Sequence, residues 1–135
     1  MAIQLERKHL VNTQQMEIAV NGPDGATHLI LCTGIADLGT VGHGIYTFLI
    51  GPTLSPRQFV GVIASGAITK IQHSEKLRSE EKLEAGLNAN LLSIDAGYDE
   101  ESMHVKVKTE VLSAFLNTKL SISYNVSILA ELPVY

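Results

Sequence analysis

The last third of the chain alternates apolar and polar residues over two long runs. In the first run the apolar side chains occupy odd positions: Met103, Val105, Val107, Val111 and Phe115. In the second run they occupy even positions: Leu120, Ile122, Tyr124, Val126, Ile128, Ala130 and Leu132. A period of two residues is typical of strands that bury one face and expose the other. These runs therefore predict half-buried β-strands for this part of the chain.

Asn117 and Thr118 separate the two runs. If the chain folds back at these residues, Val107 lies opposite Ile128 and every odd residue meets an even one. The two apolar faces then coincide, as they must in a strand pair that shares one buried face. We therefore predict a long C-terminal β-hairpin.

The first half of the chain also indicates strands. Residues 15–20 and 27–33 flank a turn-rich segment at 21–25, which is suited to a hairpin loop. Residues 44–50 form a short run rich in β-branched and aromatic side chains, which favours a buried strand.

Residues 59–71 carry two conflicting signals. The preceding Ser55 and Pro56 favour the start of a helix, whereas the segment itself is β-branched and contains Gly61 and Gly66. Because each glycine inside a helix costs about 1 kcal/mol relative to alanine, we favour a strand over a helix here.

One principal α-helix is predicted at about residues 75–92. Glutamates follow the possible caps Ser74 and Ser79, and leucines recur every fourth residue at Leu83, Leu87 and Leu91. The predicted fold class is α+β: a mostly antiparallel β-sheet or sandwich that carries this helix and the C-terminal hairpin. A length of 135 residues predicts a single β-rich domain, 1–135.

Composition disfavours several classes of protein. The net charge is −4 and the ten Lys and Arg residues are scattered, which disfavours broad nucleic-acid binding. Cys32 is the one cysteine, so no internal disulfide is possible. The first ten residues carry charges where a secretory signal needs an apolar run, and the longest apolar stretches are too short to span a bilayer. We expect a soluble protein that is used without export and does not bind membranes.

The sequence contains no recognisable motif for catalysis, cofactor binding or metal binding. The five histidines have no metal-ligand spacing, and Cys32 has no second cysteine to pair with. His28 and Cys32 would point to the same face of a strand, but four residues of strand separate them by about 13 Å. We predict no catalytic residue, no cofactor and no metal site. The acidic residues at 95–101 are interpreted as a solvated turn between the helix and the hairpin.

Two alternatives to this prediction remain open. Gly42 and Gly44 flank an imidazole, so a small enzyme or ligand-binding domain would have its site around Asp37, His43 and Tyr46. An adaptor protein would instead bind a partner through the charged segment 75–84.

The tip of the predicted hairpin is apolar on both faces, which a two-stranded ribbon open to water does not explain. Either another part of the chain covers it or a neighbouring subunit does. We predict the second, with an oligomer interface formed by Leu112, Ala114, Phe115, Leu116, Leu120 and Ile122. Small hydroxyl side chains at Ser121, Ser123 and Ser127 would allow another subunit to approach closely.

In architecture the chain resembles small structural proteins of tailed-bacteriophage particles, which are compact and β-rich and lack catalytic motifs. The resemblance implies a non-enzymatic structural subunit of a homo-oligomeric assembly: a virion component such as a decoration, connector or tail-associated protein. Its partners would be copies of itself and other proteins of the same assembly. Its location would be the virion, assembled in the host cytoplasm, with a cytoplasmic protein as the alternative.

Overall fold

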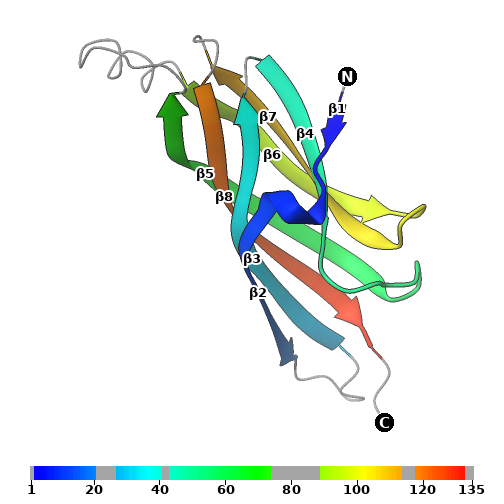
Figure 1. The fold of residues 1–135 in the computed structure, drawn as a ribbon. Helices are drawn as coiled ribbons and strands as arrows, with labels where there is room; N and C mark the ends of the chain where they lie inside the picture. Colours follow the sequence, from blue (N-terminus) through cyan, green and yellow to red (C-terminus); the bar gives the residue numbers. More distant parts are fainter. Residues whose placement is uncertain (1, 21–26, 41–42, 74–88, 114–117, 133–135) are drawn as a thin grey trace.

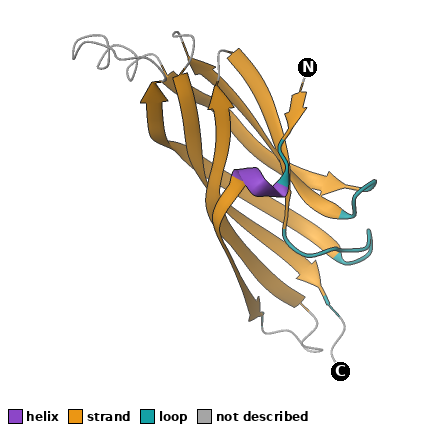
Figure 2. Ribbon diagram, in the orientation of Figure 1, coloured by secondary structure: helices purple, strands orange, loops and turns teal. Residues whose placement is uncertain are grey.

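The computed structural model describes residues 2–20, 27–40, 43–73, 89–113 and 118–132, and nearly all of them lie in β-strands (Figure 1). Figure 2 shows one short 3-10 helix beside the strands. The elements are β1 (Ala2–Gln4), η1 (Arg7–His9), β2 (Leu10–Ala19), β3 (Thr27–Thr40), β4 (His43–Ile50), β5 (Phe59–His73), β6 (Ala89–Asp99), β7 (His104–Ser113) and β8 (Thr118–Glu131).

The strands form two four-stranded sheets that pack face to face. Sheet A has the order β1-β4-β7-β6, and sheet B has the order β2-β3-β8-β5. All neighbours are antiparallel except β1 and β4, which are parallel. The chain changes sheet at every connection from β3 to β6 and again between β7 and β8. This wrapping resembles that of a jelly roll, in which each sheet covers the apolar face of the other.

The core lies between the two sheets and contains most of the residues that the alternation assigns to it; Met103 is exposed in the turn before β7, and Phe115 lies outside the described residues. Val105, Val107 and Val111 on β7 are fully buried, as are Leu120, Ile122 and Ile128 on β8. The rings of Phe48 and Tyr124 meet at a centroid distance of 5.0 Å. The prediction of two half-buried strands is therefore confirmed, together with the face that each buries.

The predicted C-terminal hairpin is wrong, because β7 and β8 belong to different sheets. Val107 pairs with Phe48 on β4, and Ile128 pairs with Ile30 on β3. Both strands are central, so each has two neighbours and neither pairs with the other. Their apolar faces do point into a common core, but across the sandwich rather than side by side.

The predicted helix at 75–92 is also wrong where the structure describes it. Residues 89–92 open β6, and 75–88 lie outside the described residues. The predicted turn at 95–101 begins too early, because β6 continues to Asp99. A bulge explains both errors: Leu92 is the extra residue between Leu91 and Ser93, so the inward positions change from odd to even numbers.

The other strand predictions are confirmed. Residues 15–19 of the predicted strand 15–20 lie in β2, and 27–33 lie in its antiparallel neighbour β3; residues 21–26 between them lie outside the described residues. Residues 44–50 are in β4, and the ambiguous segment 59–71 is in β5. The fold is thus an all-β sandwich rather than an α+β domain in the part of the chain that the structure describes.

Two glycines at the centre of sheet B allow close approaches: Gly34 makes room for the Tyr124 ring, and Gly66 makes room for the backbone of β8 and for a side chain of sheet A. Tyr124 on β8 lies between Gly34 on β3 and Gly66 on β5. A Cβ atom on Gly34 would lie 2.5 Å from the Tyr124 hydroxyl oxygen. A Cβ atom on Gly66 would lie 2.6 Å from the backbone oxygen of Ser123 and 2.9 Å from Cδ1 of Ile94. Gly66 therefore also allows β6 of sheet A to approach β5.

Candidate interaction surface

The structure separates the residues of the predicted oligomer interface. Leu112 lies on β7 with 38% of its surface exposed, on the outer face of sheet A. Leu120 and Ile122 are completely buried in the core of the chain itself. Ala114, Phe115 and Leu116 lie outside the described residues. Of the predicted set, Leu112 is thus the member that the structure places on the surface.

The residues of the alternative enzyme site do not form a common site. Asp37 is exposed on β3, where its Oδ1 accepts a hydrogen bond from the Gly39 amide at 3.1 Å. His43 is exposed at the start of β4, with its Nε2 3.6 Å from Oε2 of Glu110. Tyr46 is buried in the core, and burial raises the pKa of its phenol. Across the described ranges, no hydrogen bond or ion pair joins Asp37, His43 and Tyr46.

The outer face of sheet B is uncharged over three complete rows of paired residues. From β2 to β5, these rows are Ile18, Leu29, Leu129 and Gly61; Met16, Leu31, Ser127 and Ile63; and Gln14, Thr33, Asn125 and Ser65. Two of the side chains are prominently exposed: Met16 at 60% and Ile63 at 77% of their surface. We call these twelve positions the uncharged face. An apolar patch of this kind, bordered by small polar residues, is typical of a surface that contacts another molecule.

The outer face of sheet A has the opposite character. Lys106, Lys108 and Glu110 alternate along β7, and Asp95 lies beside Lys108 on β6. Lys106 Nζ lies 3.7 Å from Oδ1 of Asp99 at the end of β6. Such mixed charges are well solvated and are depleted from the cores of protein interfaces. The two sheets thus present one face suited to water and one suited to contact.

Strand β2 borders the uncharged face and is exposed along almost its whole length. Every residue from Val11 to Ala19 is exposed, so neither face of the strand is covered. It contains no lysine and no proline, the residues that usually protect an edge strand from pairing with another chain. Its one irregularity is the bulge between Val11 and Gln14, where Asn12 has a φ of 52°. Six residues of regular edge, from Gln14 to Ala19, follow this bulge.

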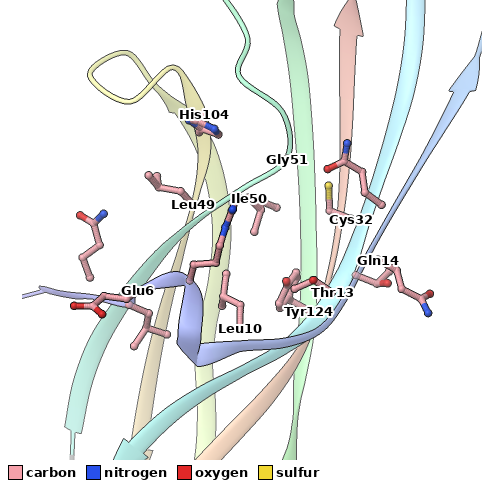
Figure 3. A pocket seen from close by; sticks show the side chains of 15 residues that line it. Glu6, Leu10, Thr13, Gln14, Cys32, Leu49, Ile50, Gly51, His104 and Tyr124 are labelled. Carbon is pink, nitrogen blue, oxygen red and sulfur yellow. The ribbon is translucent and has the colours of Figure 1, made fainter.

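A groove of about 710 Å³ lies beside β2 on the inner side of sheet B. Figure 3 shows it between η1 and the end of β4 on one side and β2 and β3 on the other. It forms because β1 pairs with residues 45–47 of β4 and leaves Leu49 and Ile50 beside the opening. The lining mixes apolar and polar side chains, including Leu10, Thr13, Gln15, Cys32, His104 and Tyr124.

The titratable groups in the groove include Cys32, Tyr124 and His104. Burial raises the pKa of the Cys32 thiol, which therefore remains protonated and weakly nucleophilic near neutral pH. Burial also raises the pKa of the Tyr124 phenol. His104 has its Nδ1 2.8 Å from the Ser102 carbonyl oxygen and its Nε2 3.3 Å from the Thr53 hydroxyl. These contacts hold the imidazole between the Ser102 carbonyl oxygen and the Thr53 hydroxyl.

Two further searches of the described ranges gave negative findings. They contain no group of three or more His, Cys, Asp or Glu side chains arranged to hold a metal ion. They also contain no helix of the length and hydrophobicity that a membrane span requires. No protein-family model, curated protein or solved structure matches this chain.

The uncharged face was not predicted from the sequence, although a signal for it exists. Residues Leu29 to Cys32 are four consecutive apolar residues in one strand. Ile30 and Cys32 are buried between the sheets, which leaves Leu29 and Leu31 on the outside. An apolar run in a strand indicates burial on both faces, and nothing in the described part of this chain covers the second face.

Proposed function

We propose that this protein is a non-enzymatic structural subunit of a homo-oligomeric assembly, and that sheet B is the surface through which it assembles. The observation that carries the proposal is the uncharged face together with its bare edge, β2. Burying a side chain such as Met16 or Ile63 against a neighbour contributes about 1.5–3 kcal/mol. A surface of this kind gains stability when another subunit covers it.

Two of the three serines predicted to allow close approach support the same surface, whereas Ser121 is buried. Ser123 and Ser127 lie on the outer side of β8, which is one of the two central strands of sheet B. Ser127 belongs to the uncharged face. The Ser123 hydroxyl donates to the Ala67 carbonyl oxygen at 3.4 Å, which satisfies it within the sheet. Short side chains whose hydrogen bonds are already made can be covered by a neighbour at little cost in desolvation.

We further propose that the assembly is a virion of the tailed-bacteriophage type, in which the subunit serves as a decoration, connector or tail-associated protein. The support is an analogy of architecture: double-sheet sandwiches with jelly-roll wrapping build many viral shells, and they also occur in proteins of other functions. The partners would be copies of the chain and other proteins of the same particle.

Light scattering on the full, untagged chain tests the proposal. The parent is expected to form a particle of several subunits at micromolar concentration. Ile63→Asp is expected to weaken association about tenfold or more, because one lost hydrophobic contact of about 1.4 kcal/mol has that effect. Circular dichroism and a thermal melt should show that the variant remains folded, since Ile63 is exposed in the single chain.

Two matched variants complete this experiment. Lys108→Asp, on the charged outer face of sheet A, is expected to leave the mass unchanged. Leu112→Asp tests the position on β7 that the sequence predicts for the interface. If this variant alone gives a smaller particle in light scattering, the interface lies on sheet A. A parent that remains a monomer would contradict assembly altogether.

A further inference from the structure

The hydrogen bonds of β2 determine which of its backbone groups remain available. The Val20 amide donates to the Thr27 carbonyl oxygen at 2.8 Å, so Val20 points toward β3. Successive residues of an antiparallel strand point their amide and carbonyl groups alternately to either side. Gln15, Glu17 and Ala19 therefore point theirs away from β3, toward the open edge.

We infer that two copies of the chain pair through β2, antiparallel about a two-fold axis that passes beside Ile18. This inference rests on the proposed function and names the contact that would join two subunits. Sheet B of one copy would continue into sheet B of the second copy and form one eight-stranded sheet. Glu17 of each copy would exchange backbone hydrogen bonds with Ala19 of the other.

The side chains of β2 are self-complementary in this register. Ile18 lies opposite its own counterpart, and Met16 lies opposite Val20 of the second copy. All three are exposed in the single chain, Ile18 at 42% and Val20 at 38% of their surface. The uncharged faces of the two copies would therefore join without a polar interruption at the axis.

Charge favours this register over its nearest neighbour. An axis beside Glu17 would place two carboxylates directly opposite each other, which destabilises a strand pair. An axis beside Met16 would place Ile18 opposite Gln14, an apolar side chain against a polar one. With the axis beside Ile18, Glu17 lies opposite Ala19, and its Oε1 can keep its 2.8 Å contact with Nδ1 of His28 in the same chain.

Cysteine cross-linking of the full chain tests the register. In a Cys32→Ala background, Ile18→Cys is expected to form a disulfide-linked dimer under mild oxidation. Residues opposite each other in a non-hydrogen-bonded antiparallel pair have Cα atoms about 4.5 Å apart, which is within the range of a disulfide. Met16→Cys alone is the matched control and should remain a monomer on a non-reducing gel. The double variant Met16→Cys, Val20→Cys should cross-link again.

The outcomes separate this inference from the proposed function. Cross-linking by Ile18→Cys but not by Met16→Cys supports the inferred axis. If the single variant Met16→Cys cross-links and Ile18→Cys does not, the inferred register is wrong. If none of these cysteines cross-links while light scattering still shows an assembly, the β2 contact is wrong and the proposed function stands. A monomeric parent would overturn both. Met16, Ile18 and Val20 are exposed, so their substitution should leave the fold intact, whereas the buried Cys32→Ala change is common to every variant and its control.

Discussion

The two long sides of the sandwich differ in whether the edge strands of the two sheets contact each other. On the closed side, β5 of sheet B and β6 of sheet A come into contact, and Ile94 lies over Gly66. On the open side, β2 lies across a groove from the end of β4, and β1 covers a short part of the β4 edge (Figure 1). The difference shows that one chain can close one pair of sheet edges by side-chain packing while, in its described residues, it leaves the edge on the other side uncovered.

The largest effect is expected on the closed side. Gly66→Ala would place a methyl group 2.6 Å from the Ser123 backbone oxygen and 2.9 Å from Ile94, so β5 or β6 must move. Overpacking of this kind lowers the free energy of unfolding by about 1–3 kcal/mol. Chemical denaturation monitored by circular dichroism measures the change.

Gly61→Ala is the matched control on the same strand. A Cβ atom there meets nothing within 4 Å, so the change in stability should stay within about 0.5 kcal/mol. Equal stability of the two alanine variants would contradict the close approach of β5 and β6 at Gly66.

A smaller effect is expected on the open side, where it should alter association rather than folding. Ala19→Lys would place an ammonium group opposite Glu17 of the second copy, whereas Ala19→Glu would place a carboxylate there. Each cross-strand pair contributes about 0.2–1 kcal/mol, and a two-fold contact contains the pair twice. We expect tighter association for the lysine variant and weaker association for the glutamate variant, by about two- to thirtyfold in each direction.

Sedimentation at low and high salt measures this difference. Added salt should bring the two Ala19 variants closer together, because exposed charges are screened. If lysine and glutamate shift the association constant in the same direction, Glu17 does not lie opposite Ala19.

The smallest effect concerns pH and the turn that joins β6 to β7. Hydrogen bonds from the Ser102 hydroxyl at 2.6 Å and amide at 3.1 Å, with Lys106 nearby, hold the pKa of Asp99 below its usual range, although burial opposes them. A carboxyl group with a lowered folded-state pKa stabilises the fold fully above its unfolded pKa of about 4, and this contribution is lost as the pH falls through the folded value.

Asp99→Asn is therefore expected to reduce the loss of stability below about pH 4. Ser102→Ala should have the same direction of effect while keeping the carboxyl group. Thermal melts between neutral pH and pH 3 measure it. An unchanged acid dependence in both variants would show that the turn has no part in it.

The sequence was sufficient to predict which residues face the core but not which strands are neighbours. Alternation along β7 and β8 depends on each strand having one covered face, and it placed Val107 and Ile128 in the core correctly. The same alternation is compatible with any antiparallel partner of matching phase. The hairpin was favoured because Asn117 and Thr118 permit a turn, whereas burial is better satisfied when β7 and β8 occupy the centres of separate sheets.

A bulge explains why β6 was not predicted as a strand. The uncharged face was not predicted for a different reason. The extra residue Leu92 breaks the period of two in β6 and left the spacing of Leu83, Leu87 and Leu91 as the more visible pattern. The uncharged face depends on residues from four strands, with Met16 and Ile63 at opposite ends of one row, and only the sheet order brings these strands together. The local run from Leu29 to Cys32 indicates two apolar faces on β3, but it does not show which strands complete the surface.

The row of Gly34, Tyr124 and Gly66 also limits the registers in which these strands can pair. A slip of two residues along β8 would preserve the alternation of inward and outward side chains, so hydrophobicity alone would tolerate it. Such a slip would move the large ring of Tyr124 against residues of β3 that carry side chains and leave a void over Gly34. Tyr124 thereby fixes the alignment of β8 with β3, and a misaligned pair would be destabilised at the centre of sheet B.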